Sequence, residues 1–404
     1  MDSSVNLPLS GIRVLEFGHM VMGPSCGMVL ADMGAEVIKV EPSGKGDKTR
    51  YLGAFGTGFH STYNRNKKSI AIDLKSELGK KAIFDLIKSA DVVTENFREG
   101  SLEKQGLGYD EVKKANPGII YCSMKGFLNG PYQHRTALDE VVQMMGGLAF
   151  MTGLPDRPLR AGASVNDIMG GMFGAIAILG ALIKRKETGE GAFVKAGLFE
   201  NCALLMAQHI ASYEHTGIES QPLTMRKSQP WPVYDLFETK DGEKIFIGLV
   251  TDSQWENFCR EFELNDLLIS QELQNNDDRV SQRDRILLPR LRELVSEFSL
   301  QQLSERLDLV GCPFAPIAKP EDLINDVHLN ASGGMLPIEI NGQLGRIPGL
   351  PVEYDNNRFG LRSQPPLVGE HSRDILSSVG YSEEQLNQLI QEQLLTLSTR
   401  DTGG

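Results

Sequence analysis

The chain has few of the features that stabilise small folds covalently or through a metal, or that insert a protein into a membrane. Its 404 residues include five cysteines, which are widely spaced and form no Cys-x-x-Cys pair, so the sequence predicts neither a disulfide framework nor a zinc site. No stretch reaches the roughly 18 uninterrupted apolar residues of a membrane span, and the N-terminal segment lacks the pattern of a signal peptide. We therefore expect a soluble, cytoplasmic protein with no metal and no membrane partner.

Positive charge is also scarce. Lysine and arginine number 41 against 53 aspartate and glutamate, a net charge of −12, which is the wrong sign for coating nucleic acid or an anionic surface. A hydrophobic fraction of 41% with 23% charged residues is typical of a folded chain and not of a disordered one. Any anionic ligand must therefore be bound by a few local cations.

The first 125 residues alternate apolar β-type runs with helical patterns, the order that builds a parallel sheet covered by helices. Strands are predicted at 13–17, 36–41, 70–74, 91–97 and 119–124, and helices at 26–34 and 76–89. Gly23 and Pro24 are expected in the loop before the first helix. A glycine-rich apolar helix at 167–186 is expected at a helix–helix or subunit contact, because small residues let another backbone approach closely. The pattern predicts an α/β fold with a doubly wound, Rossmann-like sheet.

The residue pattern of the sequence changes near three prolines, Pro222, Pro230 and Pro232, which mark a linker. Beyond it, 233–250 is predicted to be a hairpin that turns at Asp241–Gly242, and 252–309 to be helical. We predict a large domain over residues 1–220, a smaller α+β domain over 221–325, and a return of 326–404 to the large domain through two terminal helices.

Candidate ligand-binding residues follow several of the predicted strands. The loop GHMVMGPSC (18–26) follows the first strand, and the carboxyl ends of parallel strands collect ligands beside helix N-termini, although a plain βα turn is an equal alternative. Lys75, Arg98, Lys104 and Lys125 follow other strands. Together they are candidates for phosphate binding, whereas any one lysine is more often a solvated surface charge.

Asp167 precedes the glycine-rich helix, where the positive end of the helix dipole favours an ionised carboxylate. A helix cap is the alternative, since aspartate is among the best N-cap residues. His134, Asp139 and Glu140 are further acid/base candidates, or else a polar helix start.

Several long motifs, in order and over nearly the whole chain, resemble the class III CoA-transferases, which include formyl-CoA transferase and carnitine CoA-transferase and are related to the acyl-CoA racemases. The motifs are LSGIRVLEFGHMVMGPSCGMVLADMGAEVIKVEP, GDKTR, NRNKKSIAIDLKSELGKKAIFDLIKSADVVTENFREGSLEKQGLGYDEV, NPGIIYCSMKGF, NDIMGGMFGAIAILGALIKRKETGEGAFV and PPLVGEH. The resemblance implies an interlocked homodimer, a large domain built from both termini, acyl-CoA and small carboxylic acids as substrates, and no tightly bound cofactor.

The resemblance also implies roles for individual residues. Asp167 matches the family's nucleophilic aspartate, which moves CoA between carboxylic acids through an aspartyl acyl anhydride and an aspartyl-CoA thioester. The implied CoA-binding positions are Val21 and Met22 beside the thioester, Ile72, Asp73, Leu74, Lys75, Asn96 and Phe97 at the nucleotide cleft, and Arg98 and Lys104 at the phosphates or adenosine.

Departures from the family pattern bear on the substrate. Val21 stands where some formyl-CoA transferases have glutamine, and no glycine run surrounds Pro230. Both departures disfavour formyl-CoA and oxalate as substrates and favour a larger acyl donor, such as a succinyl or mesaconyl type. Arg50 or Arg160 would bind the second carboxylate of such a donor. An α-methylacyl-CoA racemase is one alternative, but Leu138 stands at that branch's histidine and cannot carry a proton. A non-catalytic CoA-binding protein is the other.

Overall fold

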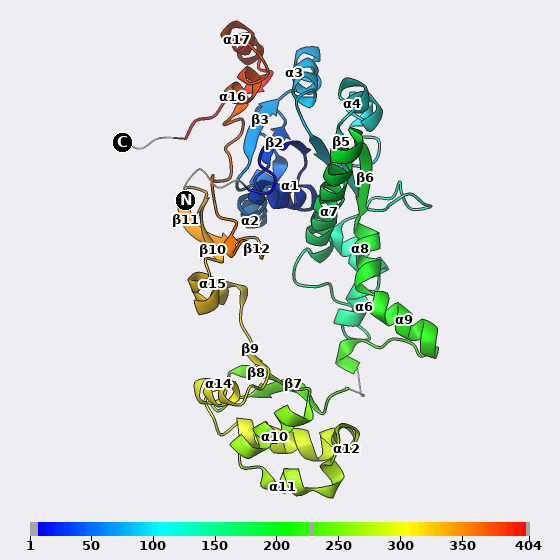
Figure 1. Cartoon of the computed structure of the whole chain (residues 1–404), viewed down its shortest axis with the longest axis vertical. Helices are drawn as coiled ribbons and strands as arrows, with labels where there is room; N and C mark the ends of the chain where they lie inside the picture. The colour runs from blue at the N-terminus through cyan, green and yellow to red at the C-terminus, as the bar shows by residue number, and fades with distance from the viewer. Residues whose placement is uncertain (1–6, 226–229, 401–404) are drawn as a thin grey trace. The chain divides into compact units, whose positions relative to one another are not determined.

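The structure is a computed structural model that describes residues 7–225 and 230–400. The chain forms two compact units, one of residues up to 224 together with those from 327 onward, and one of residues 225–326 (Figure 1). The first unit contains β1 (Arg13–Phe17), α1 (Met22–Asp32), β2 (Glu36–Glu41), η1 (Lys48–Tyr51), α2 (Gly53–Tyr63), β3 (Lys68–Ile72), α3 (Glu77–Ile87), β4 (Val92–Glu95), η2 (Glu103–Gln105), α4 (Tyr109–Ala115), β5 (Ile120–Lys125), α5 (Asp139–Met145), α6 (Leu148–Thr152), α7 (Val165–Thr188), β6 (Ala192–Gly197), α8 (Leu198–Leu205), α9 (Ala207–Thr216), α15 (Val327–Ala331), β10 (Met335–Ile340), β11 (Gln343–Pro348), β12 (Glu353–Tyr354), β13 (Asn357–Arg358), α16 (Ser372–Ser377), α17 (Glu383–Gln391) and β14 (Leu395–Thr396).

The central sheet of the first unit has seven strands in the order β14-β3-β2-β1-β4-β5-β6. Every neighbouring pair is parallel except β14 with β3. The chain winds outward from β1 to β3 on one side and from β4 to β6 on the other, so a topological switch point lies between β1 and β4. In such sheets ligands bind outside the carboxyl ends of the strands at this point. The predicted α/β class with a mainly parallel sheet is confirmed.

Helices cover both faces of this sheet, because successive strand residues point to opposite sides. Leu15 and Ile38 pack in a core with α3, α4, α16 and α17. Val14 and Val37 pack on the opposite side, in a core with α1 and α7. Coverage of both faces explains why nearly every residue of β1 to β5 is buried. The C-terminal helices therefore share a core with the N-terminal strands.

Among the described residues, α7 is the one helix that is long and apolar enough, by length and composition alone, to cross a membrane. It packs along α1 and against β5 and β6 (Figure 1), and Ala175 and Ile178 lie in the same core as those elements. These contacts make it a core helix of the α/β unit.

Two of the segments that differ from the sequence prediction have a local explanation. The first helix begins at Met22 and includes Gly23 and Pro24, which were expected in the loop. Proline is tolerated in the first turn because the N–H groups there have no intrahelical acceptor. The hairpin β10–β11 lies in a stretch expected to be irregular. Its turn, Asn341–Gly342, has positive φ at both residues, the type I′ pattern for which Asn-Gly is a strong sequence signal.

The second unit is built around an antiparallel sheet in the order β7-β8-β9. The predicted hairpin is present, with Gly242 at φ 78° in its turn. The elements of this unit are β7 (Val233–Glu238), β8 (Lys244–Leu249), α10 (Asp252–Glu261), α11 (Asn265–Ile269), η4 (Gln271–Leu273), α12 (Asn276–Ser281), η5 (Arg283–Leu287), α13 (Leu288–Val295), α14 (Leu300–Leu309), β9 (Phe314–Pro316) and η6 (Pro320–Asn325). Its helices and strands enclose their own apolar core around Phe258.

Candidate active site

The loops that follow β1 and β4 meet at the switch point of the sheet. The Asn96 side-chain oxygen accepts the His19 backbone N–H at 3.0 Å, and its amide nitrogen donates to the His19 carbonyl at 3.0 Å. The His19 ring lies 5.2 Å from that of Phe97. A Cβ atom at Gly23 would stand 2.7 Å from the Asn96 oxygen, so glycine is required for this close approach. The first turn of α1 therefore opens at the crevice where a ligand is expected.

Asp167 lies in the first turn of α7. Within residues 7–225 and 230–400, no hydrogen-bond donor contacts its carboxylate. Its backbone is held instead, because one carboxylate oxygen of Asp139 in α5 accepts the N–H groups of Asn166 at 2.8 Å and Asp167 at 3.3 Å. Asp139 is buried and receives a further hydrogen bond from Gln143 at 2.6 Å. The start of α7 is thus fixed while the Asp167 carboxylate stays free to react.

The surroundings of Asp167 favour its neutral form. Burial, followed by the negative charges of Asp139 and Glu140, raises the pKa of Asp167 to about 7 from its ordinary value of 3.8. Burial and the charge of Asp167 also raise the pKa of Tyr63, at the end of α2. Tyr63 therefore lies within electrostatic range of the same carboxylate. A carboxylate of raised basicity is a better nucleophile than an ordinary one once it is ionised.

Glycines in α7 bring Asp167 to the start of α1. A Cβ atom at Gly170 would lie 2.4 Å from the Met22 side chain, and one at Gly171 would lie 2.0 Å from the Ser25 hydroxyl and 2.7 Å from the Met22 carbonyl. Only glycine allows the two helices to pack this closely. The close packing places the first two turns of α7, which carry Asp167, against the first turn of α1.

The predicted phosphate-binding cations occupy two kinds of environment. Lys75, Arg98 and Lys104 are exposed, and no carboxylate partner contacts them in the part of the chain that the structure describes. Lys125 is buried and paired with Glu95 at 2.7 Å, and it also donates to the Phe97 carbonyl at 2.7 Å. Lys125 was predicted as one of the phosphate-binding cations, but its charge is paired with Glu95 inside the protein.

The predicted nucleotide-cleft residues after β3 also differ among themselves. The Ile72 side chain is fully buried in the core, and Leu74 packs against the same core. The Asp73 carboxylate accepts the backbone N–H of Lys75 at 2.9 Å. Val21 and Met22, after β1, are likewise buried. The buried side chains leave only backbone atoms of Ile72, Val21 and Met22 to face a ligand.

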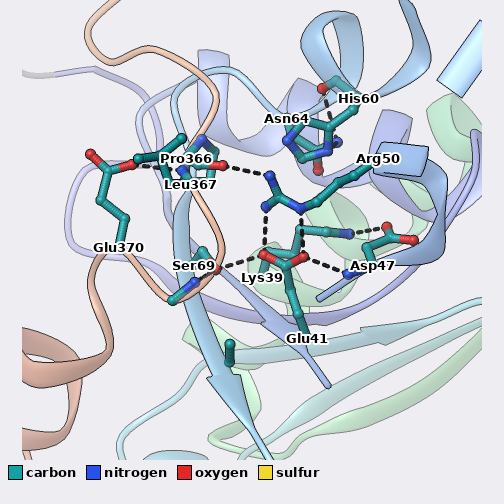
Figure 2. Close-up of polar contacts among 12 residues, drawn as sticks. Lys39, Glu41, Asp47, Arg50, His60, Asn64, Ser69, Pro366, Leu367 and Glu370 are labelled. Carbon is teal, nitrogen blue, oxygen red and sulfur yellow. Dashed lines mark hydrogen bonds and ion pairs between the residues drawn. The ribbon is translucent and has the colours of Figure 1, made fainter. Parts of the chain in front are cut away.

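Arg50, one of two candidates for binding a substrate carboxylate, is fully engaged inside the protein. Figure 2 shows its guanidinium between Glu41, which it contacts at 2.6 and 2.9 Å, and the carbonyl of Pro366 at 3.0 Å. Burial alone would raise the pKa of Glu41, but the hydrogen bonds and charge of Arg50, the charge of Lys39 and the Ser69 hydrogen bond together lower it. The C-terminal segment also reaches this network through Ser69, whose hydroxyl donates to Glu41 and accepts from the Gly369 N–H. Arg50 therefore ties the C-terminal segment to β2 and β3.

Sequence reasoning missed Tyr63 and the anchoring role of Asp139. Tyr63 is the last residue of α2, a helix that the sequence did not predict. The one sequence feature that could have pointed to Tyr63 is the family motif NRNKK, which follows it directly. Asp139 was considered as an acid or base, but its carboxylate holds the α7 backbone. Of the other acid/base candidates, His134 is exposed and contacts Gln133. Leu138, at the histidine position of the racemases, is 62% exposed.

No group of three or more histidine, cysteine, aspartate or glutamate side chains able to hold a metal ion is found among residues 7–225 and 230–400. The five cysteines are buried free thiols.

Several known proteins are similar to this chain over most of its length. A family model described as CoA-transferase family III matches residues 9–372. Succinyl-CoA:glutarate CoA-transferase of Mus musculus is 34% identical over 95% of this chain and 89% of its own length. Succinyl-CoA--D-citramalate CoA-transferase of Chloroflexus aurantiacus is 33% identical over 95% of this chain and 96% of its own. The crystal structure of a CAIB/BAIF family protein from Brucella suis superposes with a TM-score of 0.81 and 31% identity, over 93% of this chain and 100% of that one. The chain therefore belongs to CoA-transferase family III and is an enzyme of the CoA-transferase type.

Proposed function

We propose that this enzyme transfers CoA between dicarboxylic acids, with succinyl-CoA as a donor and Asp167 as the nucleophile. The observation that carries the proposal is the unpartnered carboxylate of Asp167 in the first turn of α7, a helix that packs closely on the first turn of α1. The names of the mouse and Chloroflexus relatives, which pair succinyl-CoA with glutarate or D-citramalate, support the dicarboxylic class. CoA is then a substrate and not a resident cofactor.

The reaction needs two kinds of covalent bond at Asp167. Its ionised carboxylate attacks the thioester carbonyl of the donor, which forms a mixed anhydride and expels CoA thiolate. The thiolate attacks the aspartyl carbonyl, giving an aspartyl-CoA thioester and the free donor acid. The acceptor carboxylate then attacks that thioester, forming a second anhydride and releasing thiolate. The thiolate finally attacks the acceptor acyl carbonyl, which yields the new acyl-CoA and regenerates Asp167.

Positioning accounts for much of the rate. A carboxylate held against a bound thioester gains an effective molarity of about 10⁵ to 10⁸ M over free reactants. The fixed start of α7 supplies such positioning, and exclusion of water protects the anhydrides. Backbone N–H groups near Val21 and Met22, at the opening of α1, are the groups we assign to the oxyanions of the tetrahedral intermediates.

The CoA moiety is proposed to lie along the carboxyl edge of the sheet. Arg98 and Lys104, which are exposed and lie beyond β4, would bind its phosphates or adenosine, with Lys75 beyond β3. Asn96 and Phe97 border the same crevice. Lys125 would act indirectly, by holding the Phe97 carbonyl and the turn that carries Arg98.

The assembly is proposed to be a homodimer, interlocked as the family resemblance implies. Ile176 and Ile183 on α7 are 60% and 65% exposed in the single chain, which is unusual for large apolar side chains on one helix and fits burial against a second copy. The two compact units are proposed to be the two domains that the sequence predicts. A cytoplasmic location stays a prediction.

One experiment separates catalysis from binding. Each variant is incubated with succinyl-CoA, the intact chain is weighed by mass spectrometry to detect attached CoA, and exchange into glutarate is measured alongside the affinity for free CoA. Asp167→Ala should abolish both exchange and covalent CoA while leaving the affinity for CoA within about twofold. Arg98→Ala should raise KM for the acyl-CoA with kcat nearly unchanged, because phosphate contacts bind the ground and transition states alike.

The alternatives predict other results. Exchange that persists in Asp167→Ala would remove that residue from the nucleophile role. A wild-type protein that binds CoA without exchanging it would be the non-catalytic alternative. A racemase would exchange the α-proton of a branched acyl-CoA with solvent deuterium, which requires a second acid/base group that Leu138 cannot supply.

A further inference from the structure

Arg160 begins the segment that leads into α7, and it is only loosely held. Its guanidinium pairs with Glu140 in the first turn of α5, and the two side chains are 35% and 52% exposed. No other acceptor contacts this guanidinium among residues 7–225 and 230–400. A partly exposed pair of this kind contributes only about 0–1 kcal/mol. Another carboxylate can therefore replace Glu140 at little cost.

Buried polar groups fix Arg160 and Asp167 to the same turn of α5. The Gln143 side-chain oxygen accepts the Ala161 N–H at 2.8 Å, and the Gln143 amide nitrogen donates to Asp139 at 2.6 Å. Asp139 in turn accepts the N–H of Asp167. Gln143 is fully buried and Asp139 is 3% exposed. The two ends of the loop between Arg160 and Asp167 are therefore hydrogen-bonded to the same turn of α5. This arrangement keeps Arg160 near Asp167, the proposed nucleophile.

Three other basic residues of the first unit, Arg65, Lys67 and Arg50, are already neutralised. The Arg65 guanidinium donates to both carboxylate oxygens of the buried Asp32, at 3.3 Å to Oδ1 and 2.7 Å to Oδ2. Lys67 is buried against Glu16 at 2.7 Å. Arg50 is held by Glu41, as described above. Removing any of these cations from its partner would leave a buried charge unpaired, which costs several kcal/mol. Arg160 differs in that its partner is exposed.

Negative charge is concentrated at the site, since Asp139 and Glu140 both act on Asp167. A dicarboxylic acyl group adds one more negative charge away from the reacting carbonyl, and that charge requires a cation. We propose that Arg160 binds the distal carboxylate of the dicarboxylic substrate in place of Glu140, and so selects dicarboxylic over monocarboxylic acyl groups. The guanidinium suits this role because its planar fork binds a carboxylate through two parallel hydrogen bonds.

This inference rests on the proposed function, and it is tested on the donor half of the reaction. The values of kcat/KM are measured for succinyl-CoA and butyryl-CoA, which have four-carbon acyl groups with and without a distal carboxylate, at one fixed acceptor. The wild type should prefer succinyl-CoA. Arg160→Gln should lower kcat/KM for succinyl-CoA by about tenfold or more, without lowering that for butyryl-CoA or weakening the binding of free CoA.

Three companion variants sharpen the test. Arg160→Lys keeps the charge but loses the fork, and should lie between the wild type and Arg160→Gln. Glu140→Gln removes the competing carboxylate and should lower KM for succinyl-CoA. Arg157→Gln changes an exposed arginine three residues earlier on the same loop, and should leave the ratio of the two kcat/KM values unchanged. Thermal melting of each variant shows that it is folded.

The failures of the two proposals are distinguishable. A wild type that transfers CoA from succinyl-CoA and butyryl-CoA equally well would overturn the role of Arg160 alone. An Arg160→Gln variant in which both donors lose activity equally, or in which free CoA binds correspondingly more weakly, would also overturn it. A wild type that transfers no CoA from either donor would remove the proposed function, and the role of Arg160 with it.

Discussion

The raised pKa of Asp167 predicts that this residue destabilises the protein at neutral and alkaline pH. Its carboxyl group has an ordinary pKa of 3.8, and burial together with two neighbouring carboxylates raises it to about 7. The folded state therefore holds this proton more tightly than the unfolded chain between pH 4 and pH 7. As the pH rises through that window, the contribution of Asp167 to the free energy of unfolding falls, and above pH 7 the folded state bears the full cost of the charge.

Asp167→Asn should remove this cost, because the amide has nearly the same shape and does not ionise. The difference between 3.8 and about 7 corresponds to about 4 kcal/mol at ~1.4 kcal/mol per pH unit. The side chain is only partly buried, so solvent screening reduces the expected gain to about 2 kcal/mol at pH 8. A gain of this size raises the melting temperature by several degrees in a chain of this length.

The assay is thermal unfolding of the wild type and the variant at pH 4.5 and pH 8. The melting temperature of Asp167→Asn should exceed that of the wild type at pH 8, with a much smaller excess at pH 4.5. Asp156→Asn changes an exposed carboxylate on the loop before α7 and should shift the melting temperature little at either pH. An equal effect of Asp167→Asn at both pH values, or a lower melting temperature at pH 8, would refute the reasoning.

Two other predictions concern packing and assembly. Gly171→Ala places a Cβ atom 2.0 Å from the Ser25 hydroxyl, so it should lower both the melting temperature and kcat by separating α7 from α1. Gly58→Ala, in α2, meets no atom within 4 Å and should be neutral or stabilise α2 by up to ~1 kcal/mol; equal losses in the two variants would contradict the packing argument. Sedimentation velocity at micromolar concentration should give a particle of two chains, in which we expect Ile176 and Ile183 to be protected from solvent. A single-chain particle would contradict the proposed dimer.

Much of the fold follows from local patterns in the sequence. The strands of the central sheet carry short apolar runs such as Val14–Leu15 and Ile70–Ile72, and helices between them show the spacing of an amphipathic surface. The hairpin at Asp241–Gly242 follows from turn chemistry in the same way. Asp167 could likewise be placed at the start of a glycine-rich helix, since the helix and its first residues are neighbours in the chain.

The environments of the charged residues were decided only by tertiary structure. Arg50, Lys125 and Arg98 were all candidate ligand-binding cations, yet the first two are paired with Glu41 and Glu95 inside the protein while Arg98 is exposed. Nothing in the local sequence distinguishes them, because the partner of a buried charge comes from another strand. Whether a cation is available to a ligand therefore depends on packing between distant segments.

The reactivity of the candidate nucleophile has the same origin. The sequence by itself determined that a carboxylate heads the long apolar helix. Only the folded chain brings the α5 carboxylate Asp139, 28 residues away, onto the backbone of Asp167, and only the glycine contacts with α1 set the depth of its burial. Desolvation and the charges of neighbours fix a pKa, and both depend on atoms that are close in space but far apart in the chain.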